Sequence, residues 1–299
     1  MRKTINFGFY TIKAIHKKEN RQEKGLTLFF KEIGQRPLNI EEQNHRYIYL
    51  SNENIITIAN FEYASNGIFL KLRKCRSKDI KGSFLGDGNQ EYDVNQVLNS
   101  NFHREDSTTI EESFIKIFNN GVMVFQLNKN SVTPNQFKYY LEEYLKEYRF
   151  EILPIYRNDL FEQLEKGSIK EVLLKVGFNP KGSKFNLESH SGATRIDVIF
   201  RKSHSKNFLS LQYFKELLTN RKTSKLGALD NGSIEEANIT LNNNSSPIKL
   251  EHYELREKQE FKSNEIANSQ ISNHSFFDSL LQKHSNFLRE YLARDTRYD

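Results

Sequence analysis

The chain of 299 residues contains no tryptophan, a single cysteine and no long apolar run. Because Cys75 stands alone, an internal disulfide framework and a metal site built from several cysteines are both excluded, which fits a reducing cytoplasm. The longest apolar stretches, such as Val122–Phe125, are strand-sized and far shorter than the ~18 residues of a membrane helix. Thr4, Asn6 and Gly8 interrupt the amino-terminal segment, so it does not resemble a signal peptide. We therefore expect a soluble, cytoplasmic protein.

Recognisable catalytic motifs are also missing. The chain has no Walker A loop, no Gly-x-Gly-x-x-Gly, no His-Glu-x-x-His and no Gly-x-Ser-x-Gly. The histidines are scattered, and His190 has no second histidine near enough in the sequence to share a metal. We expect no cofactor and no bound metal, and we identify no small-molecule substrate.

One nuclease-like pattern stays open as an alternative. Asp197, in a predicted strand, is followed far downstream by Glu260-Phe-Lys262. In a metal-dependent nuclease of the Asp…Glu-x-Lys type, two carboxylates bind Mg²⁺ and the lysine stabilises developing charge. The spacing is long, and Asp197 fits equally well as a cross-strand partner of a neighbouring arginine.

The positive charge of the chain is concentrated in three windows. Residues 1–24 hold seven Lys/Arg against two Glu, residues 71–81 hold six against one Asp, and residues 195–225 hold eight against two acids. The net charge is +6 and the windows carry +16, so the remainder carries −10. Such an uneven distribution favours a surface that binds a polyanion, although a single basic run is often only a solvated face.

Alternating apolar residues predict strands in both halves of the chain. The predicted strands cover residues 4–12, 47–50, 55–58, 68–72, 122–127, 152–158, 169–176, 195–200, 238–241 and 248–253. Predicted helices cover residues 26–33, 106–118, 134–149 and 208–218, and a last helix begins at Phe276. Thr133 as N-cap and Pro134 at the first helical position mark the clearest helix start. A polar, basic hairpin or loop is expected over residues 16–24.

We expect an α+β protein of two domains, residues 1–152 and 153–299, each a mainly antiparallel sheet with helices packed on it. It ends in an amphipathic helix for which Ser275 is the expected N-cap and Asp278 the third residue. Its apolar stripe consists of Phe277, Leu280, Leu281, His284, Phe287, Leu288, Tyr291 and Leu292. Core packing is the default interpretation of this stripe, and a dimer seam is the alternative.

The strongest functional constellation is a basic strand-helix unit in the second half. It consists of Arg195, Arg201, Lys202, His204 and Lys206, followed after a predicted helix by Arg221, Lys222 and Lys225. The amide groups at a helix start and nearby hydroxyls suit contacts to phosphates, which give affinity without reading bases. We predict that a second basic set, Lys71, Arg73, Lys74 and Arg76, assists it. The prediction requires these side chains to converge and not to be neutralised one by one by carboxylates.

The order of features resembles the phage-exclusion proteins of the RexA type. The resemblance rests on Phe7-Gly-Phe-Tyr10, Tyr47-Ile-Tyr-Leu50, Phe150-Glu-Ile-Leu-Pro154, Ile196-Asp-Val-Ile-Phe-Arg-Lys202 and Glu251-His-Tyr253 before the closing helix. The likeness covers most of the chain in pattern, with few identical residues. The segment 34–44 and the Gly/Ser-rich stretch 181–192 depart from the family.

The resemblance implies a homodimeric, cytoplasmic sensor of phage infection that binds double-stranded DNA and triggers abortive infection. In the lambda-type case a membrane-channel protein is the effector partner. Arg201, Lys202 and Lys206 match the basic strand-helix unit of that family. Three hypotheses therefore stand: a non-catalytic DNA-binding defence protein, a metal-dependent nuclease, and a protein-interaction module whose basic windows are incidental.

Overall fold

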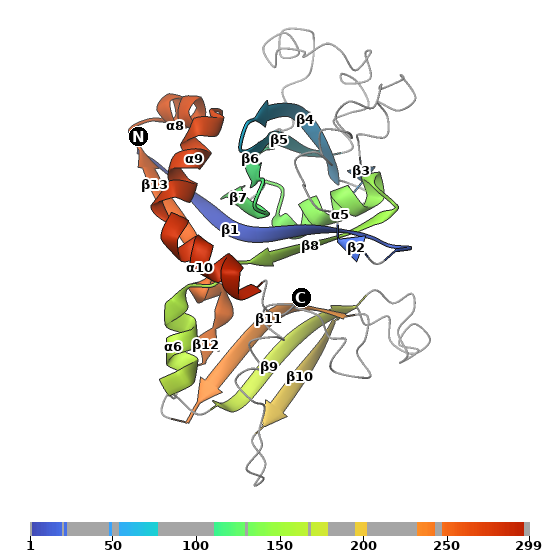
Figure 1. Ribbon diagram of the computed structural model, residues 1–299, viewed down its shortest axis with the longest axis vertical. Helices are drawn as coiled ribbons and strands as arrows, with labels where there is room; N and C mark the ends of the chain where they lie inside the picture. Colours follow the sequence, from blue (N-terminus) through green and yellow to red (C-terminus); the bar gives the residue numbers. More distant parts are fainter. Residues whose placement is uncertain are drawn as a thin grey trace. The chain divides into compact units, whose positions relative to one another are not determined.

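The structure, a computed structural model, has a mixed α+β fold with antiparallel sheets and a few helices (Figure 1). It describes residues 2–19, 21–22, 48–49, 54–76, 111–128, 131–166, 169–178, 195–201, 232–242 and 247–295. The chain divides into two compact units, Met1–Ile152 with Arg256–Asp299, and Leu153–Leu255. The helices predicted over residues 26–33 and 208–218 lie outside the described residues. No helix in the described part of the chain is long and apolar enough to cross a membrane.

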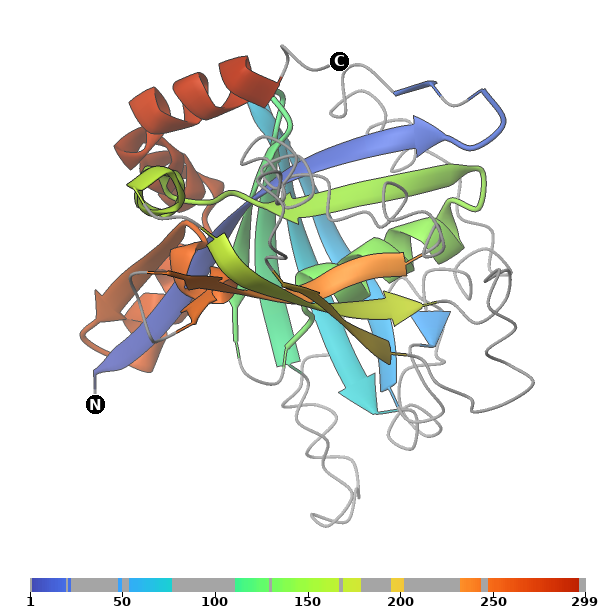
Figure 2. The ribbon, with the colours of Figure 1, turned by 90° about the horizontal axis from the view of Figure 1, so that it is seen from below.

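The first unit is built on one antiparallel sheet with the strand order β13-β1-β7-β6-β5-β4-β3, and β2 and β8 also pair with β1. The strands are β1 (Lys3–His16), β2 (Arg21–Gln22), β3 (Ile48–Tyr49), β4 (Asn54–Ala64), β5 (Gly67–Arg76), β6 (Glu111–Phe118), β7 (Val122–Leu127), β8 (Tyr148–Pro154) and β13 (Arg256–Phe261). In Figure 2, β1 runs from the N-terminus to its hairpin with β2. The predicted strands 4–12, 55–58, 68–72 and 122–127 are thereby confirmed, as are the described parts of the strand 47–50 and of the hairpin 16–24. The strand predicted over residues 152–158 is wrong beyond Pro154, because β8 ends there and a helix begins at Asn158.

Strand β6 corrects one prediction, because residues 111–118 were expected to be helical. Two early glutamates resemble a helix start, but Phe114–Phe118 is buried at every position. A strand alternates its side chains between two faces, so continuous burial means that both faces of the sheet are covered here. The turn to β7 contains Gly121, whose φ of +79° is a left-handed conformation that glycine adopts without strain.

Helix α5 (Pro134–Tyr144) packs on one face of this sheet. The Thr133 hydroxyl accepts a hydrogen bond from the Gln136 amide at 3.2 Å, and the Gln136 side chain accepts one from the Thr133 amide at 3.1 Å. This capping box fixes the helix start where the sequence predicts it. Phe137 lies edge-on to Phe125 of β7, with ring centroids 6.1 Å apart. The helix ends at Tyr144, earlier than predicted, because the chain turns there into β8.

The end of the chain forms three helices, α8 (Asn264–Ile271), α9 (His274–Lys283) and α10 (Ser285–Asp295). The predicted single closing helix is therefore two helices, divided at His284, which caps α9. The N-cap of α9 is Asn273, whose side chain accepts from the Ser275 amide, so the prediction of Ser275 was wrong. Phe277 packs its ring against Phe7 and Phe69, which fixes α9 to the face of the sheet made by these rings.

The second unit has a four-stranded antiparallel sheet with the order β10-β9-β11-β12. Its elements are α6 (Asn158–Lys166), β9 (Ile169–Phe178), β10 (Arg195–Arg201), β11 (Gly232–Leu241), β12 (Ile248–Lys249) and the 3₁₀ helix η5 (Leu250–Tyr253). Val172, Leu174 and Val176 of β9 are fully buried and form the centre of its core with Leu160 of α6. The predicted strands 169–176, 195–200 and 238–241 are confirmed, whereas 248–253 is mainly the 3₁₀ helix.

Candidate functional site

The basic residues of β5 share acidic partners on β6. The Lys71 Nζ and the Arg73 Nε lie 2.8 Å and 2.9 Å from the same Oε1 of Glu112. The strand register causes this, because it sets Arg73 directly opposite Glu112 and Lys74 opposite Glu111. Two cations on one carboxylate leave an excess of one positive charge, which is less than the sequence alone suggests. Arg76 is the last residue of β5.

Strand β10 carries the two described members of the main basic set. Arg195 is its first residue and Arg201 its last. The Arg201 Nε donates to Glu171 Oε2 at 2.8 Å, and the Arg201 side chain is 73% exposed. An ion pair this exposed contributes about 0–1 kcal/mol, so Glu171 offsets the charge without fixing the side chain firmly.

The two basic sets belong to different compact units. The β5 set lies in the first compact unit and the β10 residues lie in the second. Lys202, His204, Lys206, Arg221, Lys222 and Lys225 lie outside the described residues. One continuous groove formed by both sets therefore remains a prediction.

The carboxylates of the nuclease alternative also belong to different compact units. Asp197 is an exposed residue of β10 that lies opposite Lys175, in the second unit. Glu260 is an exposed residue of β13, in the first unit, with Lys258 Nζ 3.7 Å from its carboxylate. Within the described residues, no group of three His, Cys, Asp or Glu side chains could hold a metal ion.

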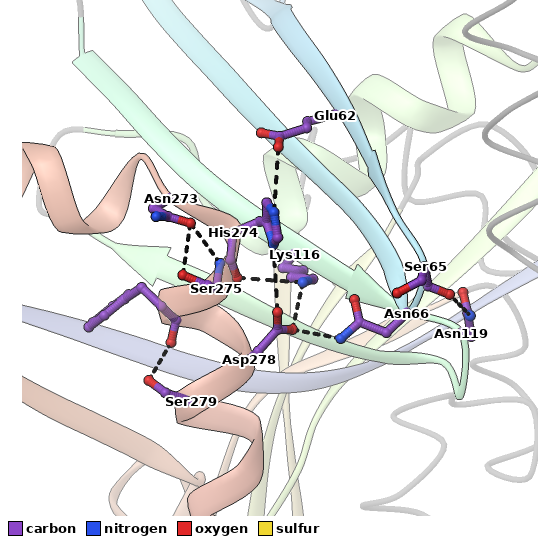
Figure 3. Close-up of polar contacts among 11 residues, drawn as sticks. Glu62, Ser65, Asn66, Lys116, Asn119, Asn273, His274, Ser275, Asp278 and Ser279 are labelled. Atoms are coloured by element: carbon purple, nitrogen blue, oxygen red, sulfur yellow. Dashed lines mark hydrogen bonds and ion pairs between the residues drawn. The ribbon is translucent and has the colours of Figure 1, made fainter.

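A buried lysine at the centre of the first sheet is the polar feature that the sequence prediction missed (Figure 3). Lys116 of β6 has no exposed side-chain surface, and its Nζ lies 2.5 Å from Asp278 Oδ1 on α9. It also lies over the Phe118 ring, 5.2 Å from the centroid, and within 3.5 Å of the His274 carbonyl. A buried cation is tolerated only with such compensation.

Asp278 accepts hydrogen bonds from two donors outside its own helix, Lys116 and Asn66, and has His274 nearby on α9. Asn66, in the β4–β5 turn, donates to Asp278 Oδ1 at 2.8 Å, and His274 Nδ1 lies 3.6 Å from Asp278 Oδ2. Desolvation by itself raises the pKa of Asp278, but the hydrogen bonds and the charge of Lys116 outweigh it and lower the pKa below its ordinary value. His274 Nε2 in turn lies 3.6 Å from Glu62 Oε1 on β4. The row Glu62, His274, Asp278, Lys116 thus connects α9 to β4 and β6.

A second acidic contact secures the other end of α9. Glu257 of β13 accepts from Lys283 at 2.9 Å, and its Oε2 lies 3.3 Å from His284 Nε2. Desolvation raises the pKa of Glu257, and the hydrogen bonds and charges of Lys283 and His284 lower it by more, so the net pKa is below ordinary. His284 also contacts the Phe9 ring edge-on, with centroids 5.0 Å apart.

These two clusters are structural in character. The Lys116 amine is closed to solvent, so it cannot act on a substrate in solution, and its geometry serves to hold α9 on the sheet. Among the described cations of the two basic sets, the Arg201 side chain is exposed and those of Lys71 and Arg73 are partly exposed, so a ligand in solution reaches Arg201 most easily. The chain matches no protein-family model, and no curated protein matches it.

Proposed function

We propose that the chain is a non-catalytic protein that binds double-stranded DNA largely independently of sequence and acts as a sensor in anti-phage defence. The uneven charge supports binding to a polyanion, because the three basic windows carry +16 in a chain of net charge +6. The resemblance to the phage-exclusion proteins supports the role in abortive infection. The proposal includes a cytoplasmic location and two α+β domains.

The observation that carries the proposal is the exposed end of β10. Arg201 is the last residue of this strand and has a side chain that is 73% exposed, so a phosphate can reach this member of the basic set. Since Glu171 already offsets Arg201, most of the phosphate contacts fall to the cations that follow. These are Lys202, Lys206, Arg221, Lys222 and Lys225, with His204 and Arg195 beside them in sequence.

The β5 set supplies the second contribution. Lys71 and Arg73 keep a net charge of +1 after pairing with Glu112, and Lys74 and Arg76 continue the same strand. Ion pairs on a surface are weak, so a phosphate competes with Glu112 for these cations at low salt. We assign the set an auxiliary role in affinity.

A charge-matched pair of variants tests the proposal. Lys202→Ala, Lys206→Ala and Lys222→Ala combined remove three cations from the proposed surface. Lys170→Ala, Lys249→Ala and Lys258→Ala remove the same charge from exposed positions outside the basic windows. We expect the first variant to weaken duplex binding about tenfold or more and to reduce the salt slope by roughly 0.9 per lost contact.

The control variant separates a local surface from overall charge. It is expected to bind within about twofold of the natural protein, since weak long-range attraction is screened at 0.15 M salt. Equal losses in both variants contradict the assigned surface. Unchanged binding in the first variant contradicts it as well.

A further inference from the structure

Strand β10, at one end of the second sheet, carries a short row of side chains that is complementary to a second copy of itself. Strand β10 stands at the end of the order β10-β9-β11-β12, and among the described strands β9 alone pairs with it. Asp197, Ile199 and Arg201 lie on its exposed face, and Ile199 is 48% exposed. An unpaired strand edge offers backbone donors and acceptors to another strand, and an apolar residue at its centre favours such pairing.

The side chains on this face already form charged rows across the sheet. Asp197 lies opposite Lys175, and the Lys175 Nζ lies 2.6 Å from Glu236 of β11. Arg201 lies opposite Glu171 and pairs with it. Between these rows Ile199 lies opposite Leu173, so one apolar row separates two charged ones.

We propose that β10 pairs with β10 of a second copy of the chain, antiparallel and with a two-fold axis at Ile199. This register sets Asp197 opposite Arg201 of the second copy, and the symmetry repeats the contact. The row then alternates in sign across the interface: Glu236, Lys175, Asp197, then Arg201 and Glu171 of the second copy. The two Ile199 side chains face each other in the apolar row between the charged ones.

Neighbouring registers lack this complementarity. The nearest alternative registers that keep the exposed faces of the two sheets on the same side place the two-fold axis at Val198 or at Phe200. An axis at Val198 sets Asp197 opposite Ile199, and an axis at Phe200 sets Ile199 opposite Arg201. Opposite charges directly across a strand pair stabilise it, whereas a charge facing an apolar side chain does not. The register at Ile199 is thus specified by chemistry on both rows.

The pairing joins two four-stranded sheets into one of eight strands. Because Arg201 belongs both to this pairing and to the proposed DNA-binding set, dimerisation is measured in the absence of DNA. A homodimer is part of the family resemblance, but the surface and the register follow from β10 itself.

Two charge-reversal variants, each alone and then mixed, test the register directly. Analytical sedimentation measures the mass of the particle as a function of protein concentration. Arg201→Asp sets two aspartates opposite each other, and Asp197→Arg sets two arginines opposite each other, in each case twice by symmetry. We expect each single variant to weaken the dimer about tenfold or more. An equimolar mixture of the two variants restores opposite charges at both contacts and should recover a dimer of natural affinity.

Glu171→Gln is the matched control, because it removes the partner of Arg201 within the chain and leaves the contact to Asp197 of the second copy. It should dimerise like the natural protein. A natural chain that stays monomeric to about 100 µM overturns the proposal. So do single variants that dimerise normally, or a mixture of folded single variants that fails to recover the dimer. Thermal unfolding of each variant shows whether it is folded.

Discussion

The Lys116 Nζ of β6 lies 2.5 Å from the Asp278 Oδ1 of α9, across 162 residues of sequence. The lysine is fully buried, and the aspartate is one-third exposed at the rim of the helix. This ion pair lets the middle of an apolar strand carry a cation, and it attaches the carboxy-terminal helices to the sheet. The stability of the first unit should therefore depend on it.

Asp278→Asn should destabilise the protein by roughly 3 kcal/mol, because it leaves Lys116 buried without a counter-charge. Guanidinium unfolding measures the loss. Lys283→Met breaks a pair in which the lysine is 51% exposed, and it should cost less than about 1 kcal/mol. Adding Lys116→Met to Asp278→Asn should recover part of the stability. Equal losses in Asp278→Asn and Lys283→Met contradict this account of Lys116.

Acid should weaken the fold through the two carboxylates whose pKa values are lowered. The pKa values of Asp278 and Glu257 lie below their ordinary values of 3.8 and 4.5. In acid, the unfolded chain therefore binds protons that the folded chain does not. Their contribution is complete above about pH 5 and is lost as the pH falls through the lowered values. The free energy of unfolding, measured from pH 7 to pH 3, should drop in the acid range. Glu257→Gln should reduce the steepness of this drop, and an unaltered profile argues against the contribution of Glu257.

Thr133→Ala should destabilise the protein by about 1 kcal/mol, because it removes the hydroxyl that accepts from the Gln136 amide at the start of α5. Thr133→Ser keeps this acceptor and serves as the control. Thermal unfolding of the two variants measures the difference. A serine variant as unstable as the alanine variant shows that packing of the threonine methyl group, and not the cap, determines stability at this position.

Supercoiled plasmid incubated with the protein and Mg²⁺ or Mn²⁺ should remain intact. Asp197, a carboxylate of the nuclease alternative, lies opposite Lys175, and within the described residues no group of three His, Cys, Asp or Glu side chains could hold the metal ion. Nicking is followed by gel electrophoresis. Cleavage that disappears in Asp197→Ala contradicts the non-catalytic assignment.

The sequence predicts those strands and helix starts that depend on neighbouring residues alone. Alternation of apolar residues gives β1, β5, β7, β9 and β10, and the Thr133 cap gives the start of α5. Strand β13 was missed because Arg256–Gln259 is polar, and its place is set by pairing with β1 from the other end of the chain. Strand β6 was taken for a helix because its continuous burial depends on layers that only the folded sheet supplies.

The candidate site shows the same contrast between features set by local sequence and features set by long-range pairing. Clusters of Lys and Arg are visible in the sequence, but their neutralisation is not. Glu112 reaches Lys71 and Arg73 through the β5–β6 register, and Glu171 reaches Arg201 through the β9–β10 register. The partner of Lys116 is still more distant in sequence. The only sequence signal of this ion pair is a lysine among the apolar residues of β6. Charge counts alone therefore overstate the binding surface.

Salt dependence of binding to two unrelated duplexes of equal length tests the central claim most directly. If phosphate contacts provide the affinity, the logarithm of the binding constant falls linearly with the logarithm of salt concentration, with a slope of about −0.9 per contact. We predict a slope corresponding to roughly three or more contacts and affinities for the two duplexes that agree within about threefold. No binding at about 50 mM salt, or a slope near zero, contradicts the account.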